Sequence, residues 1–89
     1  MNRAARITAI LSCELTPGHL EITDDSAKHA GHAGARPGGE THYTVHIEAA
    51  AFAGKSRVQR HQMVYALLND EFKNGLHALA INARAPGEA

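Results

Sequence analysis

Apolar and polar positions alternate with different periods along the chain, and each period predicts one element. The first pattern places apolar residues three or four positions apart, at Ala4, Ile7, Leu11 and Leu15. This spacing predicts a helix over residues 3–15 with one apolar stripe. Thr16-Pro17-Gly18 ends the helix, because proline cannot continue the hydrogen-bond ladder. Residues 19–23 then alternate polar and apolar, the period of a half-buried strand.

A second strand is predicted over residues 41–50. One face carries apolar side chains, at Tyr43, Val45, Ile47 and Ala49. The opposite face is polar and includes His42 and His46, for which we expect ordinary exposure to solvent. Asp24-Asp25-Ser26 closes the first strand, so the two strands are expected to form an antiparallel pair joined by a long loop.

The second half of the chain predicts helical structure followed by a strand. Ser56 and Gln59 have the spacing of a capping box. An apolar stripe follows, at Val64, Leu68 and Phe72, with Met63 and Leu67 beside it. Asn69-Asp70 could mark a bend into a second short helix, and Gly75 is a suitable helix stop.

Residues 77–82 predict a third strand. His77, Leu79 and Ile81 share one face, while Ala78, Ala80 and Asn82 share the other. Because small alanines let a helix pack closely, we expect helices to cover the alanine face. The element order predicts an α+β two-layer sandwich in a single domain over residues 1–89. Its core spans residues 3–83, with a flexible loop at 27–40 and a frayed tail at 84–89.

Composition limits the possible roles. The chain has 89 residues, enough for one small domain. Nine basic and nine acidic residues cancel, which counts against a protein that coats nucleic acid. The single cysteine excludes an internal disulfide framework and fits a reducing compartment, so we expect a cytoplasmic protein. No apolar run approaches the length that crosses a membrane.

Seven histidines make metal binding the first chemistry to consider. His29 and His32 lie three positions apart in the glycine-rich loop, and His77 stands at the head of the third strand. A lone strand histidine is ordinarily a packed or solvent-facing residue. Three histidines do not complete a structural zinc site, which normally takes four ligands. A site shared with another protein stays open.

Catalysis has little support in the sequence. Cys13 has no neighbouring histidine to activate it, and no glycine-rich phosphate loop precedes a helix. We therefore expect no enzymatic activity.

A basic cluster gathers at the predicted helix start, at Lys55, Arg57, Arg60 and His61. A positively charged helix start next to a loop could contact phosphates. The alternative interpretation is a solvated helix face.

Several motifs in the same order resemble a known family. They are LEITDDS at 20–26, ETHYTVHI at 40–47, F-x-G at 52–54, RHQMVYALL at 60–68 and GLHALAI at 75–81. Together they are similar to BolA-like proteins, and the resemblance covers about residues 3 to 83. Arg60-His61 followed by Tyr65, and the HAL triplet at 77–79, are the most specific parts.

The resemblance implies an αββααβ fold similar to a class II KH domain, with a three-stranded mixed sheet and helices on one side. It also implies a monothiol, CGFS-type glutaredoxin as partner and a shared [2Fe-2S] cluster. In such a complex the glutaredoxin and its glutathione supply thiolates, while His77 and a loop histidine supply imidazoles. The loop ligand corresponds to His29, with His32 as the alternative, and no cofactor is tightly bound when the protein is alone.

The implied role is iron–sulfur cluster trafficking or maturation, together with iron or stress signalling. Some BolA proteins are transcription regulators, so a DNA-binding function through Lys55, Arg57, Arg60 and His61 is the alternative. The KH-type GXXG loop is absent, since Asn69-Asp70-Glu71-Phe72 stands there. Alone, the protein is expected to be a monomer or a weak homodimer without membrane attachment.

Overall fold

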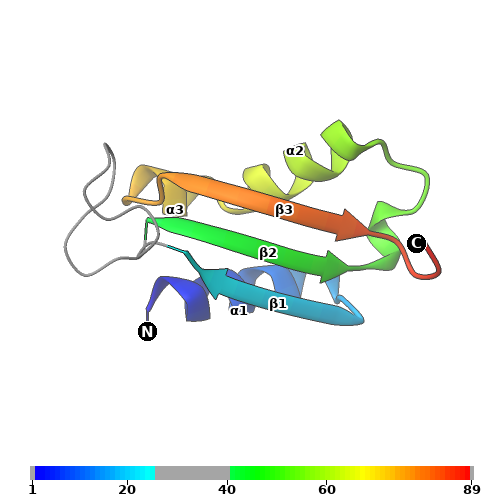
Figure 1. The fold of residues 1–89 in the computed structure, drawn as a ribbon, viewed down its shortest axis with the longest axis horizontal. Helices are drawn as coiled ribbons and strands as arrows, with labels where there is room; N and C mark the ends of the chain where they lie inside the picture. Colours follow the sequence, from blue (N-terminus) through cyan, green and yellow to red (C-terminus); the bar gives the residue numbers. More distant parts are fainter. Residues whose placement is uncertain (1, 26–40, 89) are drawn as a thin grey trace.

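The computed structural model describes residues 2–25 and 41–88. The elements follow in the order α1 (Arg3–Leu15), β1 (His19–Asp24), β2 (His42–Glu48), a 3₁₀ helix (Ala50–Phe52), α2 (Arg57–Leu67), α3 (Asn69–Lys73) and β3 (Ala78–Arg84) (Figure 1). The predicted α+β order αββααβ is therefore confirmed. The predicted loop at 27–40 lies outside the described residues.

One three-stranded sheet forms the first layer, with β2 in the centre. β1 pairs with β2 in antiparallel orientation and β3 pairs with β2 in parallel orientation, so the sheet is mixed (Figure 1). Tyr43 lies opposite Leu79 on one side and opposite Asp24 on the other. Because side chains alternate across a strand, this register puts Val45 and Ile81 on the same face.

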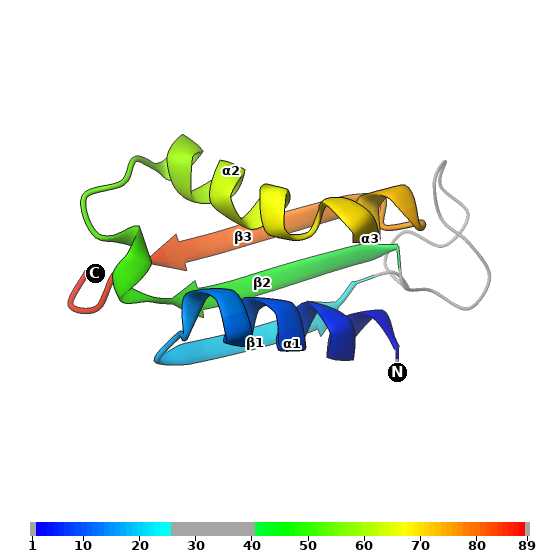
Figure 2. The same cartoon turned by 180° about the vertical axis from the view of Figure 1, so that it is seen from behind.

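The helices form the second layer, and all of them cover the same face of the sheet (Figure 2). The core lies between the layers, and its buried side chains include Ile7, Leu11, Val45, Ile47, Phe52, Val64, Leu68, Leu79 and Ile81. β1 and α3 add the partly buried Leu20, Ile22 and Phe72. The expectation that helices would cover Ala78 and Ala80 was wrong, since both alanines are exposed. Leucine and isoleucine gain more free energy from burial than alanine, so their face turns inward.

Buried charges attach α1 to α3. Arg3 is buried and donates to Glu71 Oε1 at 2.8 Å, while Arg6 donates to Glu71 Oε2 at 3.0 Å. A second amino group of Arg3 donates to the Asn74 carbonyl at 3.0 Å. Hydrogen bonds from Arg6 and Arg3 lower the pKa of Glu71, although burial opposes the shift. The network fixes the start of α1 against the short helix that precedes β3.

The helical region begins and breaks as the sequence predicts. The Ser56 hydroxyl accepts from the Gln59 backbone, and the Gln59 side chain accepts from the Ser56 backbone, so the capping box is present. α2 ends at Leu67, and α3 starts at Asn69. Gly75 has a φ of 117°, which a residue with a side chain rarely adopts, and it turns the chain towards β3.

Residues 84–88 form the end of β3 and a turn, where a frayed tail was predicted over 84–89. β3 continues to Arg84, Ala85 is buried, and Gly87 takes a positive φ in a turn closed by a bond from Glu88 N to the Ala85 carbonyl. The turn holds because Glu88 bonds to α2. None of the helices in the described ranges has the length and apolar character to span a membrane.

Candidate functional site

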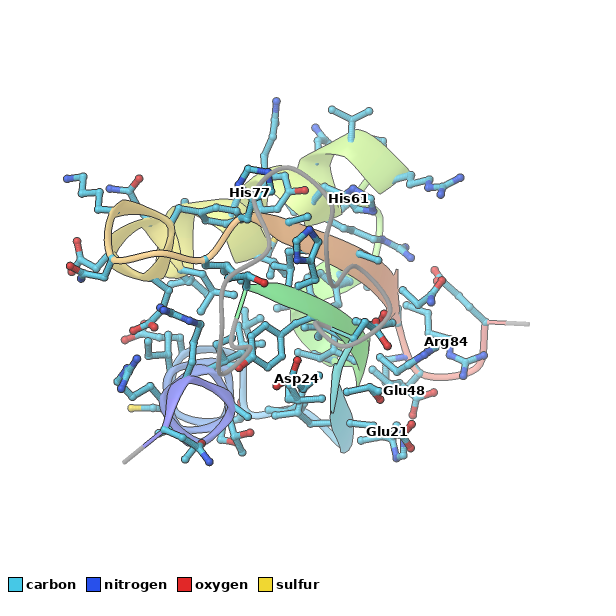
Figure 3. The ribbon with its side chains drawn as sticks, turned by 60° about the vertical axis from the view of Figure 1, so that its left-hand side comes forward. Glu21, Asp24, Glu48, His61, His77 and Arg84 are labelled. Atoms are coloured by element: carbon cyan, nitrogen blue, oxygen red, sulfur yellow. The ribbon has the colours of Figure 1, made fainter. Side chains whose placement is uncertain are left out.

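His77 immediately precedes β3, at the end of the sheet where α3 lies, and its side chain is exposed (Figure 3). Its backbone is nevertheless fixed. The N–H groups of His77 and Ala78 both donate to the Thr41 carbonyl, at 2.8 and 3.0 Å. The backbone bonds thus hold the residue in place, while the imidazole projects from the sheet end.

The ring of His42 lies beside that of His77. Their ring centroids lie 5.4 Å apart and the rings are tilted by 50°. The parallel register causes this contact, because it puts His42 opposite Ala78. His42 Nδ1 also lies 2.8 Å from Thr41 Oγ1. The expectation of an exposed His42 was wrong: the residue is only 7% exposed, since it lies against its neighbours at the sheet end. Sequence reasoning missed this pair, and only the strand register could have revealed it.

The loop histidines His29 and His32 lie outside the described residues, so their assignment as ligands stays a prediction. The residues that flank the segment are described. Asp25 donates its backbone N–H to the His42 carbonyl at 2.7 Å, and Thr41 accepts from His77. Both flanks therefore meet at the sheet end that carries His77.

A small cavity adjoins this end of the sheet. Its volume is about 300 Å³, and its lining includes Asp25, His42 and Ala78. Thr44 donates to the Asp25 carboxylate and fixes it beside the cavity. Within residues 2–25 and 41–88, no three histidine, cysteine or acidic side chains converge on one point. The described residues thus bring two imidazoles together.

The predicted basic cluster lies near the opposite end of β3. Lys55, Arg57, Arg60 and His61 line one cleft of about 680 Å³, together with the last residues of β3. Sequence analysis had missed Arg84 and His46, which come from β3 and β2, and Glu88. No local sequence signal marks these three residues, because strand register and the terminal turn bring them to the cleft.

Arg60 is the central cation of this cleft. Its guanidinium donates to both oxygens of Glu88, at 2.6 and 2.7 Å, and to the Ala83 carbonyl at 3.1 Å. The bond from Arg60, assisted by the Ala85 N–H, lowers the pKa of Glu88 to about 2. Glu88 in turn raises the pKa of Arg60. At neutral pH the pair is fully ionised, so the cleft already holds one carboxylate.

Comparison with known proteins shows which proteins have sequences similar to this chain. Residues 11–88 match the family model described as BolA-like protein. The chain is 47% identical to "Protein BOLA1, chloroplastic" of Arabidopsis thaliana over 99% of its length and 56% of that protein. It is 50% identical to "SufE-like protein 1, chloroplastic/mitochondrial" of the same plant, over 98% of this chain. There it spans only 24% of the length of the relative.

Solved structures show the same likeness. The BolA domain of SufE1 from Arabidopsis thaliana superposes with a TM-score of 0.91 at 48% identity, covering 100% of this chain and 98% of that one. BolA1 from the same plant gives a TM-score of 0.88 at 45% identity, with coverage of 100% and 97%. The mixed sheet with helices on one face is therefore the arrangement of known relatives.

Proposed function

Because this chain belongs to the BolA-like protein family, we propose that it partners a monothiol, CGFS-type glutaredoxin and co-ligates a bridging [2Fe-2S] cluster. The observation that supports the proposal is the state of His77, which has an anchored backbone and an exposed imidazole. A ligand to a cluster shared between proteins must project beyond its own surface, and His77 does so from a fixed position.

The second ligand of the proposal comes from the loop between β1 and β2. His29 is the first choice and His32 the alternative. Both flanks of that loop meet beside His77, which supports a short path from either histidine to the same iron. His42 is not assigned as a ligand, because it is buried and its Nδ1 lies against Thr41. Its contact with the His77 ring restricts the orientations of that ring.

The bound cluster would supply iron–sulfur redox chemistry, and nitrogen ligands raise its potential relative to thiolates. This chain contributes neutral imidazoles, so ligation weakens as the histidines protonate. The role that follows is cluster trafficking or maturation, with iron or stress signalling, and no catalysis by this chain. The expected cytoplasmic location stays a prediction, because the names of the two plant relatives refer to organelles.

The test is to mix the full chain with a cluster-loaded CGFS glutaredoxin that carries glutathione. Wild-type protein should change the visible absorption and circular dichroism of the cluster. His77→Ala should abolish most of that change, while far-ultraviolet dichroism confirms that the variant folds. His29→Ala and His32→Ala, measured side by side, identify the loop ligand as the position whose loss alters the spectrum.

His19→Ala is the matched control. His19 is also exposed, but it begins β1 opposite Glu48, at the other end of the sheet from His77. It should give the wild-type spectrum. A His77→Ala mixture with the wild-type spectrum would show that the ligand assignment is wrong.

The alternative function, a DNA-binding regulator, receives less support. The four predicted residues do line one cleft. However, Glu88 neutralises Arg60 at the centre of that cleft, and the net charge of the chain is zero. Phosphate binding depends on unpaired cations that release counterions. We therefore expect no salt-dependent binding of a DNA duplex, and retention of a duplex at low salt that Arg57→Ala weakens would contradict this.

A further inference from the structure

The basic cleft is a second surface, separate from the proposed cluster site. β3 begins beside His77 and runs away from it to Arg84, which lines the cleft. At about 3.3 Å per residue, the two ends of this strand are roughly 20 Å apart. Residues at the start of α2 line the other side of the cleft. Figure 2 shows that α2 runs along β3. A ligand in the cleft therefore need not touch His77.

Arg60 lines the cleft and is held there by its hydrogen bonds to Glu88 and Ala83. The side chain of Arg60 is only 12% exposed, while that of Glu88 is 40% exposed. Two amino groups of the guanidinium are occupied by Glu88 and Ala83, but the buried Nε has no hydrogen-bond acceptor among the described residues. A buried donor without an acceptor is costly. The exposed Glu88 carboxylate, and not the buried Nε, is therefore the part of this pair that an outside carboxylate can replace.

We propose that this cleft docks an acidic peptide segment of a protein partner. One carboxylate of the segment replaces Glu88 at the two amino groups of Arg60, and others reach Lys55 and Arg57. Glu88 is then an internal competitor that imitates the partner's carboxylate. The terminal turn would control access, because the turn must give up its bonds to Arg60 when the partner's carboxylate takes them.

Size and charge favour a peptide. A volume of about 680 Å³ is larger than one carboxylate or phosphate needs, and lies in the range of pockets that enclose several side chains. The positive charge is also local. Arg84 lies opposite Glu48 in the register of β2 and β3, and Glu21 lies on the same open face (Figure 3). Neither acidic residue lines the cleft, so a short peptide can avoid both, whereas the continuous phosphate backbone of a duplex would extend over the open face that carries them.

The test uses fluorescence anisotropy with a labelled synthetic peptide of about six residues, alternating glutamate and alanine, which spans about 20 Å when extended. The full wild-type chain should bind it saturably, and the glutamine version of the peptide should not bind. Glu88→Gln should bind the peptide about threefold more tightly or better, because Arg60 is released from its internal partner. Glu14→Gln removes an exposed carboxylate on α1 and should leave the affinity unchanged.

The cations are tested with a matched pair of lysines. Lys55→Gln should weaken peptide binding about threefold to tenfold. Lys73→Gln makes the same chemical change on α3, outside the residues that line the cleft, and should have no effect. Lys55 is exposed, so this variant is expected to fold, and far-ultraviolet dichroism checks it. Peptide affinity should also survive His77→Ala, which separates this site from cluster ligation.

Three results would overturn the proposal. The first is an absence of peptide binding by both wild-type protein and Glu88→Gln. The second is an equal loss of affinity in Lys55→Gln and Lys73→Gln, which would indicate general charge attraction. The third is displacement of the peptide by a short DNA duplex that binds more tightly, which would make the cleft a nucleic-acid site.

Discussion

Two arginine–glutamate clusters hold this small domain together, and they differ in burial. Glu71 is buried between Arg3 and Arg6 and links α1 to α3. Glu88 is 40% exposed and links the terminal turn to Arg60 on α2. Water can solvate the separated ions of the second cluster, whereas loss of one partner leaves a buried charge in the first. The chemistry is the same, but only the exposed cluster can exchange its carboxylate for an outside one.

The largest expected effect is on the buried cluster. Glu71→Gln removes the charge that compensates Arg3 and should lower the free energy of unfolding by about 3 kcal/mol. Urea unfolding followed by circular dichroism measures it. Glu14→Gln, at an exposed position of α1, should stay within about 0.5 kcal/mol of wild type. Equal stability of Glu71→Gln and wild type would mean that burial does not distinguish the two clusters.

The next effect is on the response to acid. The pKa of Glu71 in the folded protein lies below its ordinary value of 4.5. The ionised Glu71 carboxylate therefore stabilises the folded state fully above pH 4.5. This stabilisation is lost as the pH falls through the lowered pKa. Wild-type protein should therefore lose stability in acid more steeply than Glu71→Gln. Unfolding free energies measured at a series of pH values below 4.5 test this, and parallel curves would contradict it.

A smaller effect is expected at the start of α2, which carries the cations of the cleft. Ser56→Ala removes one half of the capping box and should destabilise the protein by about 1 kcal/mol. Amide hydrogen exchange should rise in the first turn of α2 and remain unchanged in α1. An equal rise in exchange in both helices would indicate that the cap does not act locally.

The smallest stability effect is expected for Glu88→Gln. The lost ion pair is partly solvated, so the shift in Tm should be smaller than for Glu71→Gln at low salt. It should become undetectable at about 1 M salt, where exposed charges are screened. Thermal unfolding at two salt concentrations is the measurement. A large, salt-independent shift would show that the terminal turn is a structural element and could not open for a peptide.

The sequence alone predicted those features of the fold whose physical cause lies in neighbouring residues. The spacing of Ile7, Leu11 and Leu15 predicted α1, and the box of Ser56 and Gln59 predicted the start of α2. Gly75 predicted the turn before β3, because few other residues tolerate its φ. Such features depend on neighbours within about four positions, which the sequence shows directly.

Features that depend on distant pairing were missed. The burial of His42 follows from its position opposite Ala78 in a parallel pair, which no local pattern reveals. The role of Glu88 depends on a contact with Arg60, 28 positions earlier in the chain. His77 was singled out by the family resemblance, since periodicity alone allowed an ordinary strand histidine. Its role as a ligand remains a prediction for the spectroscopic test.

The mixed pairing of β2 also sets an order for folding. The antiparallel neighbour β1 precedes β2, whereas the parallel neighbour β3 is made only after α2 and α3. While β3 is missing, one edge of β2 exposes unpaired backbone groups that can recruit another chain. A chain that stops before residue 78 should therefore aggregate during synthesis, and pairing with β3 should be the slow step in refolding, because distant contacts form late.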